Sequence, residues 1–230
     1  MNWQDDKDIF GRLHLLTQSE LLKNIRNTID QYDVDLSDCL SWGQLKSKRW
    51  LVDVLKELDV DLGNVFLCAG WYAILANMIL SNFSKVNKIR SFDIDPHCAN
   101  IADSINKNFV INNWKFKSIT EDIYKINYKS HNWSVWSKKN KRYSYPITDI
   151  PDTIINTSCE HLEYFSYWYN LLPDEKFIVL QSNNFEDTKE HVNYCTDIKQ
   201  FSEQTPMQKV LFCGELDVGK YTRFMKIGYK

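Results

Sequence analysis

Apolar residues follow two alternating patterns over most of the chain. Short continuous apolar runs predict buried strands at residues 64–68, 89–92, 114–119, 153–156 and 177–181. Apolar residues at helical spacing predict helices between them, at residues 72–83, 96–109 and 162–169. Because strands that alternate with helices are joined by crossover connections, the pattern predicts an α/β protein with a parallel sheet.

The two ends of the chain depart from this alternation. Residues 1–60 carry only helical periodicity, which predicts a helical lead-in. The β-like runs 208–214 and 221–228 are separated by six residues, too few for a crossover helix, so they should pair as an antiparallel hairpin.

Composition narrows the class of protein. A chain of 230 residues with 43% hydrophobic residues has room for one α/β domain with a substantial core. No apolar run approaches the roughly 20 residues of a membrane span, and Asp5 and Asp6 make the N-terminus unlike a signal peptide. We therefore expect a soluble, cytoplasmic protein without a membrane partner.

Cysteine, histidine and charge patterns exclude several further classes. The six cysteines form no C-x-x-C pair and no histidines cluster at ligand spacing, so neither a disulfide framework nor a metal site is expected. The formal net charge of -2 argues against a uniformly basic nucleic-acid-binding surface.

Two turns of the predicted sheet carry candidate ligand-binding residues. Gly70, with the small residues Ala69 and Ala73, stands between the first strand and its helix, where backbone amides bind a carboxylate or phosphate. Asp93 ends the second strand, about 20 residues past this turn, where a carboxylate accepts hydrogen bonds from ribose hydroxyls. Asp95 and Pro96 then form a typical helix start.

From about residue 46 onward, these motifs and the terminal hairpin resemble the class I (Rossmann-like) S-adenosylmethionine-dependent methyltransferases. The resemblance implies a doubly wound, mostly parallel seven-stranded sheet with a C-terminal antiparallel hairpin. It divides the chain into an N-terminal helical extension, residues 1–45, and a methyltransferase-like domain, residues 46–230. The loop departs from the family pattern, since Gly70 is its only glycine and no acidic residue precedes it.

The resemblance also implies a cofactor, S-adenosyl-L-methionine, and a set of binding residues. Asp93 would bind the ribose, Asp122 the adenine amino group, and Ile123 the adenine ring. Asn156 matches the polar residue at the tip of the fourth strand, next to the transferring methyl group. The full set of implied cofactor-binding residues is Ala69, Gly70, Trp71, Ala73, Asp93, Ile94, Asp122, Ile123 and Asn156.

Candidate catalytic residues follow the fourth strand. Besides Asn156, the titratable residues Glu160, His161 and His191 are candidates for removing a proton from the acceptor. Cys159 is an alternative nucleophile, but it lacks the preceding proline of the pyrimidine-C5 methyltransferases. No Asn-Pro-Pro-aromatic sequence follows Asn156, which argues against a standard DNA adenine-N6 or cytosine-N4 enzyme.

The insertion at residues 123–148 combines basic and aromatic residues and contains no acidic residue. Its basic side chains are Lys125, Lys129, Lys138, Lys139, Lys141 and Arg142. Basic and aromatic side chains together bind phosphates and stack on bases, so a nucleic-acid acceptor is one interpretation, and a solvated loop with aromatic anchors is the other.

The sequence leaves the reaction and the acceptor open. Nucleic acid and small molecules both remain as acceptors. Alternatives to methyl transfer are an adenosylmethionine-binding sensor or interaction module without catalysis, and an aminocarboxypropyl transferase that uses the same loop. A NAD-dependent oxidoreductase would share Asp93, but it would require a fuller G-x-G-x-x-G turn.

Overall fold

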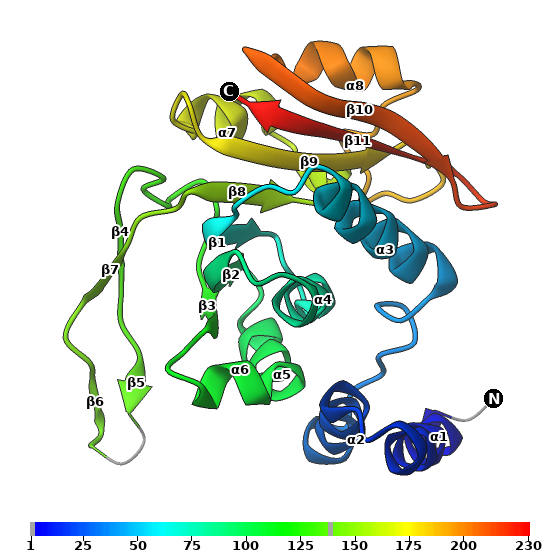
Figure 1. Cartoon of the computed structure of the whole chain (residues 1–230), viewed down its shortest axis with the longest axis vertical. Helices are drawn as coiled ribbons and strands as arrows, with labels where there is room; N and C mark the ends of the chain where they lie inside the picture. Colours follow the sequence, from blue (N-terminus) through cyan, green and yellow to red (C-terminus); the bar gives the residue numbers. More distant parts are fainter. Residues whose placement is uncertain (1–2, 138–139) are drawn as a thin grey trace.

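A seven-stranded sheet forms the centre of the structure (Figure 1), a computed structural model that describes residues 3–137 and 140–230. In spatial order its strands are β10 (Lys209–Asp217), β11 (Thr222–Tyr229), β9 (Phe177–Asn183), β8 (Thr153–Asn156), β1 (Gly63–Cys68), β2 (Val86–Asp93) and β3 (Phe116–Thr120). Strands β9, β8, β1, β2 and β3 are parallel, whereas β11 is antiparallel to both β9 and β10. The predicted mostly parallel sheet with a terminal hairpin is confirmed.

Helices α4 (Ile74–Asn82), α5 (Pro96–Ile105) and α7 (Phe165–Leu171) lie near their predicted positions. Helix α6 (Lys107–Ile111) follows α5, and α8 (Ile198–Gln204), before the hairpin, was not predicted. The single helix predicted at residues 96–109 is wrong, since the chain breaks at Asn106. The buried Asn106 side chain donates to the carbonyls of Ala73 and Ala102, and so ties this break to the turn after β1.

Alternating residues of β1 build the cores on the two faces of the sheet. Val65 and Leu67 pack with residues of α3 and α4, whereas Phe66 and Cys68 pack with residues of α7 and α8. Because β1 is buried on both faces, its sequence is a continuous apolar run rather than an alternating one.

Three helices precede the sheet: α1 (Trp3–Thr17), α2 (Glu20–Tyr32) and α3 (Trp42–Glu57). The fully buried Leu51 and Leu55 make α3 part of the central core, and this helix begins four residues before the expected boundary at residue 46. Within the described part of the chain, no helix is long and apolar enough to cross a lipid bilayer.

The insertion after β3 forms an extended hairpin (Figure 1). Its four short strands are β4 (His131–Trp133), β5 (Trp136–Ser137), β6 (Arg142–Tyr143) and β7 (Ile147–Asp149), which pair as β4 with β7 and β5 with β6. These strands were not predicted, because two or three residues carry too little periodicity to indicate a strand.

A buried ion cluster attaches this hairpin to the sheet. Asp149 is 1% exposed and accepts hydrogen bonds from Arg90 Nε of β2 and Trp133 Nε1 of β4, both at 2.7 Å, and it also pairs with Lys88. Burial acts to raise the pKa of Asp149, but its contacts with Lys88 and Arg90 outweigh that effect and hold the pKa below its ordinary value. The carboxylate therefore stabilises the fold at neutral pH.

We expect Asp149→Asn to destabilise the protein by about 3 kcal/mol, because it leaves the buried Arg90 guanidinium without a counter-charge. The matched control is Asp53→Asn, which removes an exposed i,i+4 pair with Arg49 and should cost roughly 0–1 kcal/mol. Urea unfolding at pH 7 measures both. Equal losses in the two variants would contradict the role of the cluster.

Candidate functional site

The carboxyl ends of β1, β2 and β8 border a crevice at the centre of the sheet. The chain leaves β1 toward β2 and later returns to β8 on the other side of β1, so the crevice lies at a topological switch point, where open α/β sheets bind ligands. Two cavities of about 760 and 340 Å³ open there. Both are lined by Ala69, Asp93, Ile94 and His161, and they therefore adjoin.

The turn after β1 holds an unusual backbone conformation beside the larger cavity. Ala69, Trp71 and Ala73 have positive φ angles of 49°, 49° and 53°, which non-glycine residues rarely adopt. The turn is fixed by two hydrogen bonds to β2, from Gly70 N to the Phe92 carbonyl (3.0 Å) and from Trp71 N to Asp93 Oδ2 (2.8 Å). Strained backbone of this kind concentrates at ligand-binding sites.

Gly70 lines the larger cavity, and its lack of a side chain is required by the packing of the turn on the sheet. A Cβ atom at this position would lie 2.1 Å from Ser91 Oγ of β2 and 3.2 Å from Leu67 Cγ. The added atoms of any side chain at position 70 would therefore point into β2.

Asp93, the candidate ribose ligand, lines both cavities. Its Oδ2 accepts from Trp71 N and its Oδ1 from Asp95 N at 3.1 Å. An ionised carboxylate has about four lone-pair positions, so Asp93 retains capacity for further donors. The neighbouring Ile94 is 70% exposed and also lines both cavities.

The smaller cavity is mainly apolar and aromatic. Asp122 and Ile123, the candidate adenine-binding residues, line it together with Leu162, Glu163 and the tyrosines Tyr124 and Tyr164. The two tyrosines meet edge to face at 6.5 Å, and the phenol oxygen of Tyr124 accepts from Tyr164 N. Such a surface suits a flat, aromatic ligand group.

Helix α3 and the segment before it form a polar wall of the larger cavity, which includes Asp38, Cys39, Gln44 and Lys48. None of these residues was predicted as a site residue. Burial lowers the pKa of Lys48 to about 8, and the charge of Arg223 acts in the same direction. A sequence signal existed, because Lys48 precedes the buried Leu51 and Leu55 by three and seven residues and so shares their helix face.

Two predicted catalytic residues lie beneath the surface. Asn156 is fully buried and lines neither cavity, and its Oδ1 accepts from Ser158 N. Glu160 is 2% exposed and accepts hydrogen bonds from Arg223 and Asn183. The residues of this segment that line the larger cavity are Thr157 and Ser158 instead. No sequence pattern pointed to Arg223, because it lies in the terminal hairpin.

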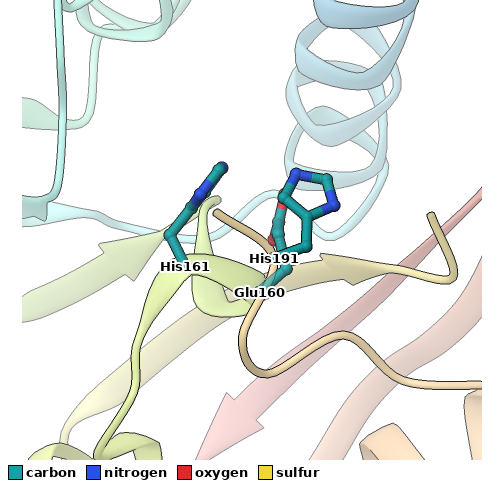
Figure 2. A group of neighbouring side chains, drawn as sticks. All are labelled: Glu160, His161 and His191. Atoms are coloured by element: carbon teal, nitrogen blue, oxygen red, sulfur yellow. The ribbon is translucent and has the colours of Figure 1, made fainter. Parts of the chain in front are cut away.

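His161 and His191 lie together with Glu160 (Figure 2). Glu160 and His161 belong to the short helical turn η1 (Cys159–His161), and His191 comes from the loop after β9. One ligand atom from each residue lies within 4.8 Å of the others, and the two imidazole rings meet edge to face at 4.7 Å. The fold thus brings together residues that are distant in the sequence, which their spacing along the chain does not indicate.

The remaining candidates lie outside the cavities. Cys159 is fully buried, and burial raises its pKa well above the ordinary value, which disfavours a thiolate nucleophile. Lys138 and Lys139 lie outside the described residues. The described part of the 123–148 insertion lines the cavities only through Ile123 and Tyr124. Its buried Tyr128 and Trp133 are anchors, whereas Trp136, Tyr143 and Tyr145 are exposed near the tip.

No protein-family model and no curated protein sequence matches the chain. Solved structures share its fold. The N-methyltransferase NodS from Bradyrhizobium japonicum WM9 with bound S-adenosyl-L-homocysteine is 8% identical, with a TM-score of 0.56 over 91% of this chain and 99% of that one. The magnesium protoporphyrin IX methyltransferase ChlM from Synechocystis PCC 6803 is 12% identical, with a TM-score of 0.55 over 92% and 88%.

The [4+2]-cyclase SpnF is also similar, at 9% identity and a TM-score of 0.58 over 81% of this chain and 82% of that one. At these identities the likeness establishes the Rossmann-like fold of class I methyltransferases. It does not establish the reaction, because proteins of this fold include one described as a cyclase.

We expect Gly70→Ala to destabilise the protein by about 1–3 kcal/mol, because the new Cβ overlaps Ser91 Oγ. Adding Ser91→Ala removes that oxygen and should restore part of the loss, giving a coupling of roughly 0.5–3 kcal/mol in a double-mutant cycle. Chemical denaturation of the four proteins measures it. Additive effects would mean that Gly70 is not confined by β2.

Proposed function

We propose that this protein binds S-adenosyl-L-methionine and transfers the methyl group to an acceptor. The observation that carries the proposal is the pair of adjoining cavities at the switch point, with Asp93 between an apolar, aromatic chamber and a polar one. S-adenosylmethionine has matching parts: an aromatic base, a ribose diol and a charged amino-acid end. The fold shared with NodS and ChlM, whose structures hold S-adenosyl-L-homocysteine, supports the same ligand.

In this proposal the adenine occupies the smaller cavity. Ile123 and Tyr124 supply apolar contact to the ring, and Asp122 accepts from the adenine amino group. Asp93 accepts from the two ribose hydroxyls, and Ile94 covers the ribose from the exposed side. Support comes from the position of all five side chains on the cavity walls.

The methionine part would then extend into the larger cavity, along the turn formed by residues 69–73. Lys48 supplies a positive charge for the cofactor carboxylate, and Asp38 supplies a negative charge for its ammonium group. Ala69, Trp71 and Ala73 contribute the wall of the turn. Gly70 contributes indirectly, by letting this turn pack directly against β2.

Methyl transfer needs alignment more than acid or base strength. An electron pair on the acceptor forms the new bond to the methyl carbon while the carbon–sulfur bond breaks, and the sulfur leaves as a neutral thioether. His161 lines both cavities, and the His191 ring contacts the His161 ring. These two imidazoles are therefore placed to accept a proton that the acceptor releases. Buried Glu160 and Asn156 act as positioning residues beneath them.

The cysteines support a cytoplasmic location. All six are free, and five are buried, as is usual in a reducing compartment.

The cavity walls favour a small acceptor. The described tip of the basic hairpin lies apart from these walls, so a small molecule that fits the 760 Å³ cavity is the simpler substrate class. Calorimetry with the cofactor, followed by mass spectrometry of an acceptor mixture, separates a transferase from a cofactor-binding module without catalysis.

We expect Asp93→Ala to weaken S-adenosyl-L-homocysteine binding at least ten-fold, because a charge-assisted contact contributes roughly 1.5–3 kcal/mol. Titration calorimetry measures the affinity. The matched control is Asp95→Ala, which removes a carboxylate that also lines the cavity but caps α5 through His97 N. It should lower stability by about 1 kcal/mol and leave affinity within a few fold. Wild-type affinity in a folded Asp93→Ala protein would contradict the assignment.

The lowered pKa of Lys48 makes a separate prediction. Below about pH 8 its amine is protonated and attracts the ligand carboxylate, and above that pH the attraction is lost. Wild-type affinity for S-adenosyl-L-homocysteine should therefore exceed that of Lys48→Met by roughly ten-fold at pH 7, and the difference should shrink toward zero by about pH 10.

Calorimetry from pH 6.5 to 10 checks this, since the titration of the ligand itself contributes equally to both proteins. The control Lys46→Met changes a lysine on the same helix that bonds to the Asp217 carbonyl, and it should follow the wild-type curve. Parallel curves for wild type and Lys48→Met would exclude a role for Lys48 in holding the carboxylate.

A further inference from the structure

The two histidines beside Glu160 are held in one tautomer. His161 Nδ1 lies 3.1 Å from the Glu190 carbonyl oxygen, and His191 Nδ1 lies 2.6 Å from the Phe185 carbonyl oxygen. A carbonyl can only accept, so each Nδ1 is the donor and each Nε2 is the ring nitrogen left available for a metal ion. Histidines that bind metals are oriented by this same kind of hydrogen bond from the other ring nitrogen.

Glu160 gives a second, independent indication. One carboxylate oxygen, Oε1, accepts from Arg223 and from Asn183 Nδ2 at 2.7 Å. The other oxygen, Oε2, is buried and has no hydrogen-bond partner in the described part of the chain, in a side chain that is 2% exposed. A buried carboxylate oxygen without a partner is unusual, and its lone pairs are left available to a ligand beside the two imidazoles.

We propose that Glu160, His161 and His191 form a binding site for one divalent transition-metal ion. The ligand atoms lie within 4.8 Å of one another, and the three side chains lie on the same side of η1, with the Glu160 carboxylate between the two rings in the view of Figure 2. Ligands of one tetrahedral ion are about 3.3 Å apart, for bonds of roughly 2.0–2.1 Å. Binding of one ion therefore requires the exposed His161 to move toward the other two ligands.

The charges around the site select the kind of ion. Arg223 already pairs with Glu160, so the three ligands themselves offer little net negative charge. Mg²⁺ and Ca²⁺ depend on several charged oxygen ligands and should bind poorly. Zn²⁺, Co²⁺ and similar ions bind strongly to neutral imidazole and suit two histidines and one carboxylate.

The ion would stand in the wall of the crevice, because His161 lines both cavities. Three protein ligands leave at least one coordination position for water or an acceptor oxygen. If the proposed transferase function holds, an acceptor hydroxyl bound there would lose its proton more readily, and the histidines would act as ligands instead of bases. Metal binding itself does not depend on that function.

The test is metal binding by the purified whole chain, freed of metal by a chelator. Titration with Co²⁺, followed by visible absorption, and competition for Zn²⁺ against a chromophoric chelator should show one ion per chain, with millimolar Mg²⁺ failing to displace it. The double variant His161→Ala/His191→Ala should bind at least about 100-fold more weakly, since loss of even an outer-shell partner costs roughly 10–100-fold.

The control is His97→Ala, which removes an exposed histidine elsewhere on the surface and should bind like wild type. Glu160→Gln keeps the shape of the side chain and should also weaken binding, with circular dichroism checking its fold. No tight Co²⁺ or Zn²⁺ binding by wild type, or equal affinity in the double variant, would overturn the proposal. Calorimetry of S-adenosyl-L-homocysteine on the same samples distinguishes failure of the metal site from failure of the cofactor site.

Discussion

A buried ion pair between Glu160 and Arg223 connects the parts of the protein that surround the crevice. Arg223 lies on β11 and donates to Glu160 of η1, to the Thr157 carbonyl after β8 and to Ser47 Oγ of α3. Asn183 at the end of β9 donates to the same carboxylate. Because both charged groups are buried, removal of either partner would leave an uncompensated charge, so these elements are held in one arrangement.

This network also determines the electrostatics of the larger cavity. Burial acts to lower the pKa of Arg223, but the Glu160 carboxylate raises it overall, so the guanidinium stays charged. Its charge in turn helps burial to depress the pKa of Lys48, which lines the cavity. The terminal hairpin therefore does more than close the sheet, since one of its side chains organises a site formed by strands that come earlier in the chain.

The other side of the crevice depends on the contact between the turn after β1 and the end of β2. Gly70 permits a close approach to Ser91, and Asp93 accepts from the amide of Trp71. The tight turn requires positive φ angles at Ala69, Trp71 and Ala73. The same carboxylate thus shapes the turn and faces both cavities, which links the local strain of the backbone to the proposed binding of a ribose.

The similar fold of NodS, ChlM and SpnF shows how far architecture constrains chemistry. The sheet provides a crevice of defined position, and the side chains at its rim decide what happens there. In this protein the distinctive rim residues are Lys48, the Glu160–Arg223 pair and the two histidines. They provide the specific reasons to expect a charged ligand and a metal ion at this crevice.

The sequence by itself determined the order of the strands along the chain, the antiparallel ending and the position of Asp93, because each depends on local periodicity or on spacing within one βαβ unit. Tertiary structure alone decided the rest. Three residues that are far from η1 in the sequence reach it only when the sheet is assembled: Arg223, Lys48 and His191. Asn156 and Glu160 are buried, and each forms hydrogen bonds within the protein. Long-range packing sets burial and charge pairing, and a linear pattern does not contain that information.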